Sequence, residues 1–505
     1  MQLVAYGAQD IYLTGNPQIT FFKVVYRRHT NFAVESIEQT FNGSAKLGNK
    51  FSCTISRNGD LLSQVYLEMD VTVTNRLSSV QSLTIGGTAV PGTTGNLAVS
   101  TASNGVVTIS GTDAADAIDT ATLQANTAAG VADVTATQFD DLTNQISVSG
   151  VNGSQRIGLR AIKYIEVEIG GQCIDKHYGE WMDIWVGLSK NSQQWIKHNR
   201  LVNATLSNNT GSKKLYVPLQ FWFCQNPGLA LPLIALQYHE VKLNVEFNQS
   251  VTWTHTLDAN TTPQVATSIT ESNGVTFQSS GAIVYDDGNG NQTINANSVI
   301  EITNATTRNI MTINNCCVFC DYIFLDTDER RRFAQVSHEY LIEQLQYSNA
   351  LNLNSGNNQF ELRFNHPVKE LVWAAQTDSD TGNNFNYFPT NTTTNPEMIT
   401  KALLQLNGHD RFREREGSYF RCVQPYQYHS GADGQSKADE WGGYYMYSFA
   451  LKPADHQPSG TCNFSRIDNA VLTVNAVENG VVKVFARNYN VLRIMSGMGG
   501  LAYSN

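Results

Sequence analysis

The sequence predicts an all-β protein in which two copies of one antiparallel domain follow each other along the chain. Three observations support this prediction. Apolar and polar residues alternate with a period of two in many short runs, which is typical of strands with one buried face. Few runs show the spacing of a helix face. The predicted elements also recur in the same order in both halves of the 505-residue chain.

The composition fits large packed cores. Hydrophobic residues make up 41% of the chain and charged residues 15%, which excludes an intrinsically disordered protein and a collagen. The formal net charge is −10, so we expect no direct binding to nucleic acid, which needs clustered lysine and arginine. We expect neither a membrane-spanning helix nor a signal peptide, because no apolar run is long enough and residues 1–18 lack a basic-then-apolar leader.

The first predicted strands form a hairpin within residues 50–70. Phe51, Cys53 and Ile55 alternate with polar residues, and Asn58-Gly59 precedes a second apolar run. Asn-Gly accepts the positive φ angles of a tight hairpin turn. Further strands are predicted at residues 162–169, 215–223, 240–247, 317–325, 339–346, 359–364, 370–375, 402–406, 444–451, 470–476 and 481–489.

Two short helices are predicted, one in each half. Residues 179–190 place Trp181, Ile184, Trp185 and Leu188 on one apolar helix face. A second helix is predicted at residues 415–423. Between the halves, Asp326 and Glu329 have the spacing of a capping box, which predicts one helical turn in a short, rigid linker.

An internal repeat is the most informative feature. The matching segments have the same predicted elements: strand–turn–strand, strand–turn–helix, strand, and strand. About eight strands per copy in two packed sheets fit a jelly roll. The matched pairs are residues 51–69 with 360–376, 165–188 with 403–423, 215–224 with 444–453, and 240–247 with 469–476.

Two segments differ from the rest and are predicted to be long surface insertions in the first jelly roll. Residues 77–155 contain no Lys, Arg, Glu, His, Trp or Tyr, and residues 248–309 contain one Arg and no Lys. Short polar hairpins within them are expected, for example at residues 106–110. The predicted organisation is an N-terminal arm (1–30), a first jelly roll (31–325), a linker (326–337), a second jelly roll (338–495) and a C-terminal tail (496–505).

Four long motifs resemble one protein family. They are MQLVAYGAQDIYLTGNPQITFFKVVYRRHTNFA at the start, FWFCQNPGLALPLIALQYHEV at 221–241, DYIFLDTDERRRFAQVSHEYLIEQLQ at 321–346 and NYNVLRIMSGMGGLAYSN at the end. The chain is similar in these motifs to the major capsid protein of large nucleocytoplasmic DNA viruses. The resemblance covers essentially the whole chain apart from the two insertions.

The resemblance implies a double jelly roll that trimerises into pseudo-hexameric capsomers, which tile an icosahedral viral shell. It also implies that loops of the first jelly roll form outer towers. The implied partners are neighbouring capsomers, minor capsid and penton proteins and, through the N-terminal arm, an internal membrane. The implied location is the virion, with assembly in the host cytoplasm.

The sequence predicts no catalytic, cofactor-binding or metal-binding residues, so the protein is not expected to be an enzyme. His239-Glu240 and His338-Glu339 begin like the zinc-protease motif HExxH, but Leu243 and Ile342 occupy its fifth position. The chain has no Gly-Lys dipeptide for a phosphate-binding loop and no G-x-S-x-G nucleophile motif.

Three cysteines and one loop are candidate metal sites. Cys316, Cys317 and Cys320 are the best metal candidates, but their spacing matches no zinc signature, and buried strand cysteines are favoured. All eight cysteines are expected to be free thiols in a reducing compartment. Residues 285–291 (YDDGNGN) have oxygen ligands for Ca²⁺, yet a solvated hairpin turn is favoured.

Other polar clusters are expected at the surface. Lys23, Arg27, Arg28 and His29 form a basic cluster that suits either an acidic partner or lipid headgroups, or a solvated arm. Arg411, Arg413, Glu414, Arg415 and Glu416 predict an exposed or interfacial ion-pair network. We do not predict glycosylation of the sequons at Asn42, Asn152, Asn203, Asn260, Asn304 and Asn391, although glycan on outer loops stays open.

Two alternatives to a shell protein remain at this point. One is a carbohydrate- or receptor-binding β-sandwich, with polar loops and aromatics such as Trp253 forming the ligand site. The other is a sugar-active enzyme on a β scaffold. The repeat over the whole chain favours the shell protein, because a lectin needs no duplicated barrel.

Overall fold

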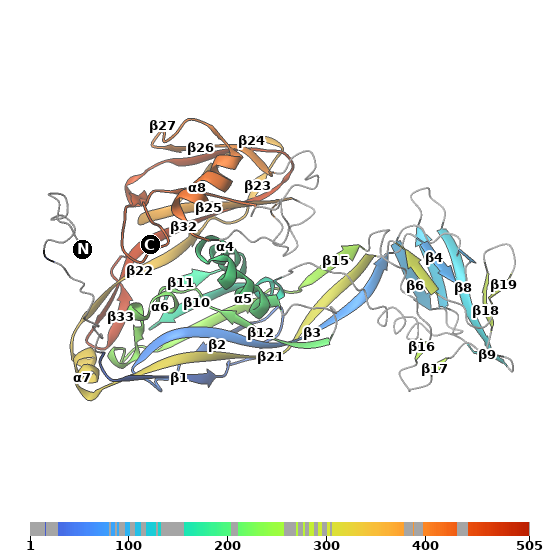
Figure 1. Cartoon of the computed structure of the whole chain (residues 1–505), viewed down its shortest axis with the longest axis horizontal. Helices are drawn as coiled ribbons and strands as arrows, with labels where there is room; N and C mark the ends of the chain where they lie inside the picture. The colour runs from blue at the N-terminus through green and yellow to red at the C-terminus, as the bar shows by residue number, and fades with distance from the viewer. Residues whose placement is uncertain are drawn as a thin grey trace, which may run out of the picture.

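The structure is a computed structural model. It describes residues 29–79, 156–203, 211–256, 306–377, 397–431 and 443–503, together with Asn16, Tyr387 and the backbone of strand segments within 82–132 and 269–303. Strands dominate, and they form two jelly rolls followed along the chain from blue to red in Figure 1.

The first jelly roll has two sheets that face each other across one core, each built on four main strands. The short strands β13 (Leu231–Pro232) and β15 (Thr252–Thr256) also pair with one of these sheets. Strands β1, β21, β3 and β12 form one sheet in that order, and β11, β10, β14 and β2 form the other. Alternate residues of these strands are buried, for example Leu67, Met69 and Val71 of β3. The strands are β1 (Phe32–Gln39), β2 (Lys50–Thr54), β3 (Leu61–Ser79), β10 (Ile162–Ile169), β11 (Gln172–His177), β12 (Gly211–Pro218), β14 (Val241–Phe247) and β21 (Thr306–Leu325).

The second jelly roll repeats this plan. One sheet has the order β22-β32-β25-β29 and the other β24-β31-β26-β27. Short strands β23 (Leu351–Leu353), β30 (Cys462–Asn463) and β33 (Met498–Leu501) extend the first of these sheets, and β28 (Arg415–Glu416) the second. The main strands are β22 (His338–Tyr347), β24 (Gly356–Glu361), β25 (Pro367–Thr377), β26 (Ile399–Leu406), β27 (His409–Asp410), β29 (Tyr444–Ser448), β31 (Ala470–Ala476) and β32 (Gly480–Met495).

The predicted internal repeat is confirmed strand by strand. If the eight main strands of each jelly roll are numbered along the chain, both have one sheet in the order 1-8-3-6 and another in the order 2-7-4-5. The four pairs of matching segments therefore occupy equivalent places in the two copies. The all-β, double jelly-roll prediction is correct.

The predicted hairpin in residues 50–70 is wrong. β2 pairs with β14 and β3 pairs with β21 and β12, so the chain crosses from one sheet to the other between β2 and β3. Gly59 serves this crossing by close packing, since a Cβ there would lie 2.7 Å from the Cβ of Tyr322. The buried Tyr322 also donates a hydrogen bond from its hydroxyl to the Ser56 carbonyl at 2.7 Å.

The first predicted helix is confirmed, whereas the second begins later than predicted. α4 (Gly179–Ser189) buries Trp181, Ile184, Trp185 and Leu188 as expected. In the second jelly roll Arg415 and Glu416 belong to β28, and a π-helical turn (Tyr419–Val423) continues into α8 (Gln424–Tyr428). Within the described residues, no helix combines the length and hydropathy needed to cross a membrane.

The periodicity analysis missed three helices of the first jelly roll. They are α3 (Ile157–Ala161), α5 (Ser192–Asn203) and α6 (Trp222–Gln225). The strand predicted at residues 215–223 therefore ends early, at Pro218. Proline lacks the N–H needed to continue a ladder, and the apolar run beyond it is buried as a helical turn instead.

The two insertions are built together from strands. A sheet of order β19-β18-β8-β7-β6 combines strands from both, because β8 of the first pairs with β18 of the second. β3 and β21 lead from the first jelly roll toward this sheet, which lies at the far right of Figure 1. The hairpin expected near residues 106–110 is confirmed by β7. The strands are β4 (Ser82–Ile85), β5 (Thr88–Ala89), β6 (Asn96–Thr101), β7 (Val107–Thr112), β8 (Ile118–Thr127), β9 (Gly130–Ala132), β15 (Thr252–Thr256), β16 (Ile269–Thr270), β17 (Thr276–Phe277), β18 (Ala282–Asp286), β19 (Asn291–Ile294) and β20 (Ile300–Thr303).

The linker is more helical than the single turn predicted. α7 (Thr327–Gln335) begins at the N-cap Asp326, whose side chain accepts a hydrogen bond from the Thr327 N–H at 2.8 Å. Asp60 of the first jelly roll binds the chain before and within α7: its carboxylate accepts hydrogen bonds from the Leu325 N–H and from the Arg330 guanidinium, each at 2.8 Å. The linker is thereby fixed to the first jelly roll.

Candidate functional site

The candidate site is the junction between the two jelly rolls, where apolar and polar contacts join them. α4 of the first jelly roll packs on the β22-β32-β25-β29 sheet of the second, as Figure 1 shows. The rings of Trp181 and Phe485 lie 5.3 Å apart between their centroids. The other buried members of this apolar cluster are Ile184, Trp185, Leu188, Leu345, Val372, Ala374, Tyr387, Tyr444 and Met446.

The helix fits the second jelly roll so closely that a side chain at position 187 would force a neighbour to move. A Cβ on Gly187 would lie 2.3 Å from the hydroxyl oxygen of Tyr444. Packing continues below the helix, since the hydrophobic core of the first jelly roll includes Ile342, Leu492 and Ile494 from the second. The two domains therefore share one core at the junction.

A buried network of charged groups lies beneath α4. The carboxylate of Glu370 accepts hydrogen bonds from Arg487 and His429, each at 2.7 Å. Arg487 also contacts Glu343, whose second oxygen lies 2.5 Å from the ammonium of Lys369. Each charge is thus paired, as burial requires.

The first jelly roll covers this network. The ring of Trp185 from α4 stacks on the Arg487 guanidinium, with 3.6 Å between Cζ and the ring centroid. Burial alone would raise the pKa of Glu370, but His429 and Arg487 outweigh it and lower that pKa to about 2. Burial lowers the pKa of Lys369 to about 8, with the Arg487 charge adding to the effect.

Polar contacts cross the junction directly. Glu180 of α4 pairs with Lys483 of β32 at 2.5 Å. Asp175 of β11 accepts a hydrogen bond from the Leu345 N–H of β22 at 3.0 Å, and Gln344 donates to the carbonyl of Ile174. These contacts fix the position of one domain along the other.

The end of the chain adds a third connection. β33 pairs with the end of β32 and returns to the first jelly roll. The Tyr238 N–H donates to the Gly497 carbonyl at 3.0 Å, and the Leu501 N–H donates to the Gln172 side chain at 3.2 Å. The two domains are therefore held by α4, by the linker and by the C-terminal strand.

The two HExxH-like pairs lie in different jelly rolls. His239 Nδ1 lies 2.9 Å from the Gly499 carbonyl oxygen, and His338 Nε2 lies 2.8 Å from the carbonyl oxygen of Phe333. Glu339 forms an ion pair with Arg493 at 2.8 Å. Across the part of the chain that the structure describes, no three His, Cys, Asp or Glu side chains are placed to hold a metal ion.

The three candidate cysteines are buried on one strand, β21. They are free thiols, as are the other five. Burial raises the pKa of Cys317 to about 12 and that of Cys316 and Cys320 well above its usual range. The position of all three on β21 and their exposed fractions of 0–7% match the interpretation as buried strand cysteines.

The remaining candidates are surface features or lie outside the described residues. The 285–291 segment joins β18 to β19, where Asp286 pairs with Asn291, but residues 287–290 lie outside the description. Lys401 and Glu414 form an exposed ion pair at 3.6 Å in the mixed-charge run. Of the sequons, Asn42 is exposed and Asn203 ends α5. Lys23, Arg27, Arg28, Asn152, Asn260, Asn304 and Asn391 are outside the described residues.

The sequence analysis missed the charged network of the junction. Its only signal was the pair Lys369-Glu370 inside an apolar strand, together with Arg487 in another. Charged residues are seldom fully buried unless they are paired, so such positions mark candidate internal ion pairs. Nothing in the sequence identified their partners.

Comparison with known proteins identifies the family. The model for "Large eukaryotic DNA virus major capsid protein" matches residues 329–500, and that for "Major capsid protein N-terminus" matches residues 20–113 and 130–326. The major capsid protein of Pyramimonas orientalis virus is 42% identical, with 100% of this chain and 99% of the relative covered. That of Paramecium bursaria Chlorella virus 1 is 37% identical, with the same coverage.

Solved structures agree. A quasi-atomic model of the PBCV-1 virus capsid contains a chain 32% identical to this one, with a TM-score of 0.61 and coverage of 96% of this chain and 100% of that one. The Faustovirus major capsid protein, 14% identical, has a TM-score of 0.58 and coverage of 97% and 94% and shares the fold. These relatives support a structural capsid role and not the carbohydrate- or receptor-binding alternative. With its fold, the matching family models and its full-length relatives in agreement, the chain belongs to the major capsid proteins of large eukaryotic DNA viruses.

Proposed function

We propose that three copies of this chain form a trimer, and that the six jelly rolls of the trimer make a pseudo-hexameric capsomer that tiles an icosahedral shell. The observation that carries the proposal is the junction. It holds two domains of identical strand order in one fixed relation. Threefold symmetry acting on such a pair produces six similar sides, which suits lateral packing in a shell.

Size-exclusion chromatography with light scattering tests the trimer. The expected mass is three times the 55.7 kDa of one chain. Electron micrographs of the same sample should show six-sided particles. A monomer at micromolar concentration would contradict the proposal, whereas a trimer that lacks six-sided outlines would contradict the role of the two jelly rolls in it.

We propose that the surface around the start of β1 faces the interior of the shell. Phe32 pairs with Leu325, so the start of β1 lies beside the end of β21, which leads into the linker helix α7. Phe32 and Val34 are 55% and 56% exposed, and Arg331 and Arg332 of α7 are also exposed. Apolar and basic side chains together suit an anionic membrane surface.

Flotation with vesicles tests this inner face. The full chain should float with vesicles that contain phosphatidylserine and remain unbound with purely zwitterionic ones. Replacing Arg331 and Arg332 by Gln should weaken flotation, while replacing the exposed Lys452 and Arg363 by Gln serves as the matched control. Equal flotation of both variants would contradict this placement.

The finer assignments are proposals of the same kind. Neighbouring capsomers, minor capsid proteins and penton proteins are the proposed partners, and the host cytoplasm is the proposed place of assembly. We propose no catalytic activity, since the role of the relatives is structural. Residues 31–325 and 338–495 are the proposed limits of the two jelly rolls.

A further inference from the structure

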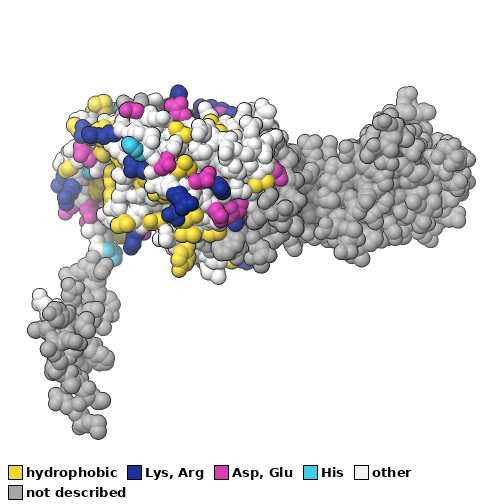
Figure 2. All heavy atoms as spheres, turned by 90° about the horizontal axis from the view of Figure 1, so that it is seen from above, with side chains coloured by type: hydrophobic (Ala, Val, Ile, Leu, Met, Phe, Trp, Pro, Cys, Tyr) yellow, Lys and Arg dark blue, Asp and Glu magenta, His cyan; other side chains and the backbone are white. Residues whose placement is uncertain are grey.

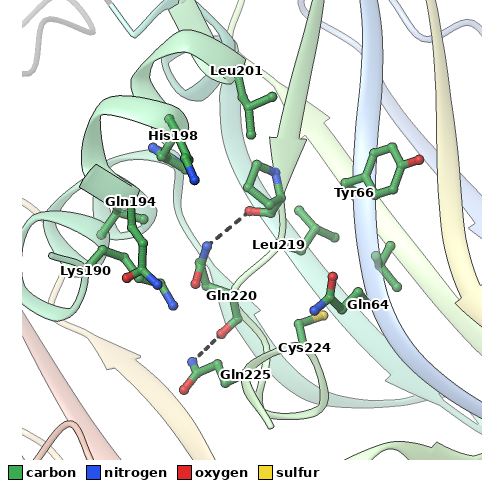
Figure 3. Close-up of a pocket in the computed structure, with 14 residues that line it drawn as sticks. Gln64, Tyr66, Lys190, Gln194, His198, Leu201, Leu219, Gln220, Cys224 and Gln225 are labelled. Carbon is green, nitrogen blue, oxygen red and sulfur yellow. Dashed lines mark hydrogen bonds between the residues drawn. The ribbon is translucent and has the colours of Figure 1, made fainter. Parts of the chain in front are cut away.

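A hollow of about 280 Å³, with both apolar and polar lining residues, lies on the first jelly roll. Figure 3 shows α5 with Gln194 and His198 on one side and Gln64 with Cys224 on the other, and Gln220 lies between them. The rim reaches the surface, because Gln64 and Gln194 are exposed. The volume is just below the roughly 300–1,000 Å³ of pockets for drug-sized ligands, so a small chemical group fits it best.

The lining is positively charged. Lys190 follows α4 and Lys197 lies on α5, and both line the hollow. No aspartate or glutamate lines it. Among the described residues neither ammonium group has a carboxylate within ion-pair distance, unlike Lys163, Lys214 and Lys483, which all do. Within the described part of the chain, the charge of the two lysines is therefore not balanced by a carboxylate.

His198 supplies a buried group without a partner. Its side chain belongs to a residue only 8% exposed, and its Nε2 has no hydrogen-bond partner within the described residues. Burial lowers the pKa of His198 to about 4, assisted by the charges of Arg156 and Lys190, so the ring is neutral at neutral pH. A neutral imidazole has one donor nitrogen and one acceptor nitrogen, and leaving either of them buried and unpaired costs free energy.

We propose that this hollow binds a small oxyanion, a carboxylate or a phosphate group. Lys190 and Lys197 supply the charge, and His198 donates a hydrogen bond from Nε2. A charge-assisted pair of this kind is stronger than a neutral hydrogen bond. The group comes either from a free inorganic anion or from an acidic side chain of a neighbouring copy, since each copy carries 44 aspartates and glutamates.

Calorimetric titration of the full-length protein with inorganic phosphate, and separately with acetate, tests the chemistry. The wild type should bind at least one of the two. In the double variant Lys190→Gln/Lys197→Gln the dissociation constant should rise about tenfold or more. The control variant Lys46→Gln/Lys452→Gln removes two exposed charges that do not line the hollow and should bind like the wild type.

A third variant tests whether the lysines act only through long-range attraction of the anion and not through a defined site. His198→Asn keeps both lysines and should also weaken binding, and thermal unfolding shows whether this variant is folded. If the wild type binds neither anion, or if Lys190→Gln/Lys197→Gln binds as tightly as the control variant, the proposal is overturned. Unchanged binding by a folded His198→Asn variant would remove His198 from the site.

Light scattering of self-association at low salt separates the two sources. An acidic side chain of a neighbouring copy as the occupant predicts that phosphate inhibits association and that Lys190→Gln/Lys197→Gln associates less than the control. A free anion as the occupant predicts binding of phosphate without either effect. Both results support an oxyanion site, and they differ in whether a free anion or an acidic side chain of a neighbouring copy occupies it.

Discussion

Glu370 is the residue on which the buried charges of the junction depend. Its carboxylate is fully buried and pairs with both Arg487 and His429. Removing one partner from a buried ion pair leaves an uncompensated charge, which costs about 3–5 kcal/mol. The loss of stability would therefore affect the junction, where the two domains pack against each other.

We therefore expect Glu370→Gln to lower the free energy of unfolding by about 3–5 kcal/mol. Urea unfolding followed by tryptophan fluorescence measures this, because Trp185 covers the network. Glu339→Gln is the matched control: its ion pair with Arg493 is half exposed and worth about 0–1 kcal/mol. If both variants lost a similar free energy of unfolding, the buried ion pairs of the network would stabilise the protein no more than an exposed ion pair does.

The same carboxylate predicts sensitivity to acid. Its pKa is about 2 in the folded protein against a usual 4.5. Between these values the unfolded chain binds more protons, so the stabilisation is complete above about pH 4.5 and is lost as pH falls toward 2. The urea midpoint of the wild type should fall more steeply from pH 5 to pH 3 than that of Glu370→Gln. Parallel pH profiles would refute the assignment.

At the scale of elements, α4 is the part of the first jelly roll that locks onto the second. Gly187→Ala places a methyl group 2.3 Å from the Tyr444 hydroxyl, and overpacking of this kind costs about 1–3 kcal/mol. We expect the melting temperature to drop accordingly. Tyr444→Phe removes the clashing oxygen, so the double variant should lose less than the sum of the two single variants. Strict additivity would mean that the two residues do not meet.

The insertions make a second prediction about elements. Removing residues 80–155 alone leaves β18 without its partner β8 and exposes a strand edge, which favours aggregation. Replacing both 80–155 and 257–305 by flexible linkers should give a soluble protein. The second linker can be short, because Thr256 and Thr306 are paired neighbours. An insoluble double deletion, or a well-behaved single one, would contradict this view of the insertions as one unit.

Strand patterns could be predicted from the sequence, but the connections between strands could not. Alternation at Phe51, Cys53 and Ile55 correctly located β2, since burial of one face produces that pattern. Asn58-Gly59 indicated a hairpin, yet the pair serves a crossing between sheets, because packing against Tyr322 decides the path. The α6 turn was read as strand because its apolar run is too short to show a helical period. The charged network was missed because its pairs join residues on different strands and loops, from 26 positions apart for Lys369 and Glu343 to 144 for Glu343 and Arg487.

At the scale of the whole molecule, the two jelly rolls form one cooperative unit. Ile342, Leu492 and Ile494 of the second lie in the core of the first, and α4 of the first covers the second. Differential scanning calorimetry of the monomer, after dissociation of the proposed trimer, should show one unfolding transition. Residues 338–503 expressed alone should be insoluble. Two separate transitions, or a soluble isolated second jelly roll, would show that the junction is a mere contact between independent domains.

The shared sheet of the two insertions has an evolutionary consequence. β8 and β18 are neighbouring strands of one sheet. A lineage that lengthens or shortens either insertion must therefore change the other as well, so that the backbone N–H and C=O groups of both strands keep their hydrogen bonds. Diversification of this outlying region should therefore proceed by coordinated exchange of both segments. A foreign epitope displayed in this region should be grafted into the loops between strands, and β8 and β18 should be left unchanged.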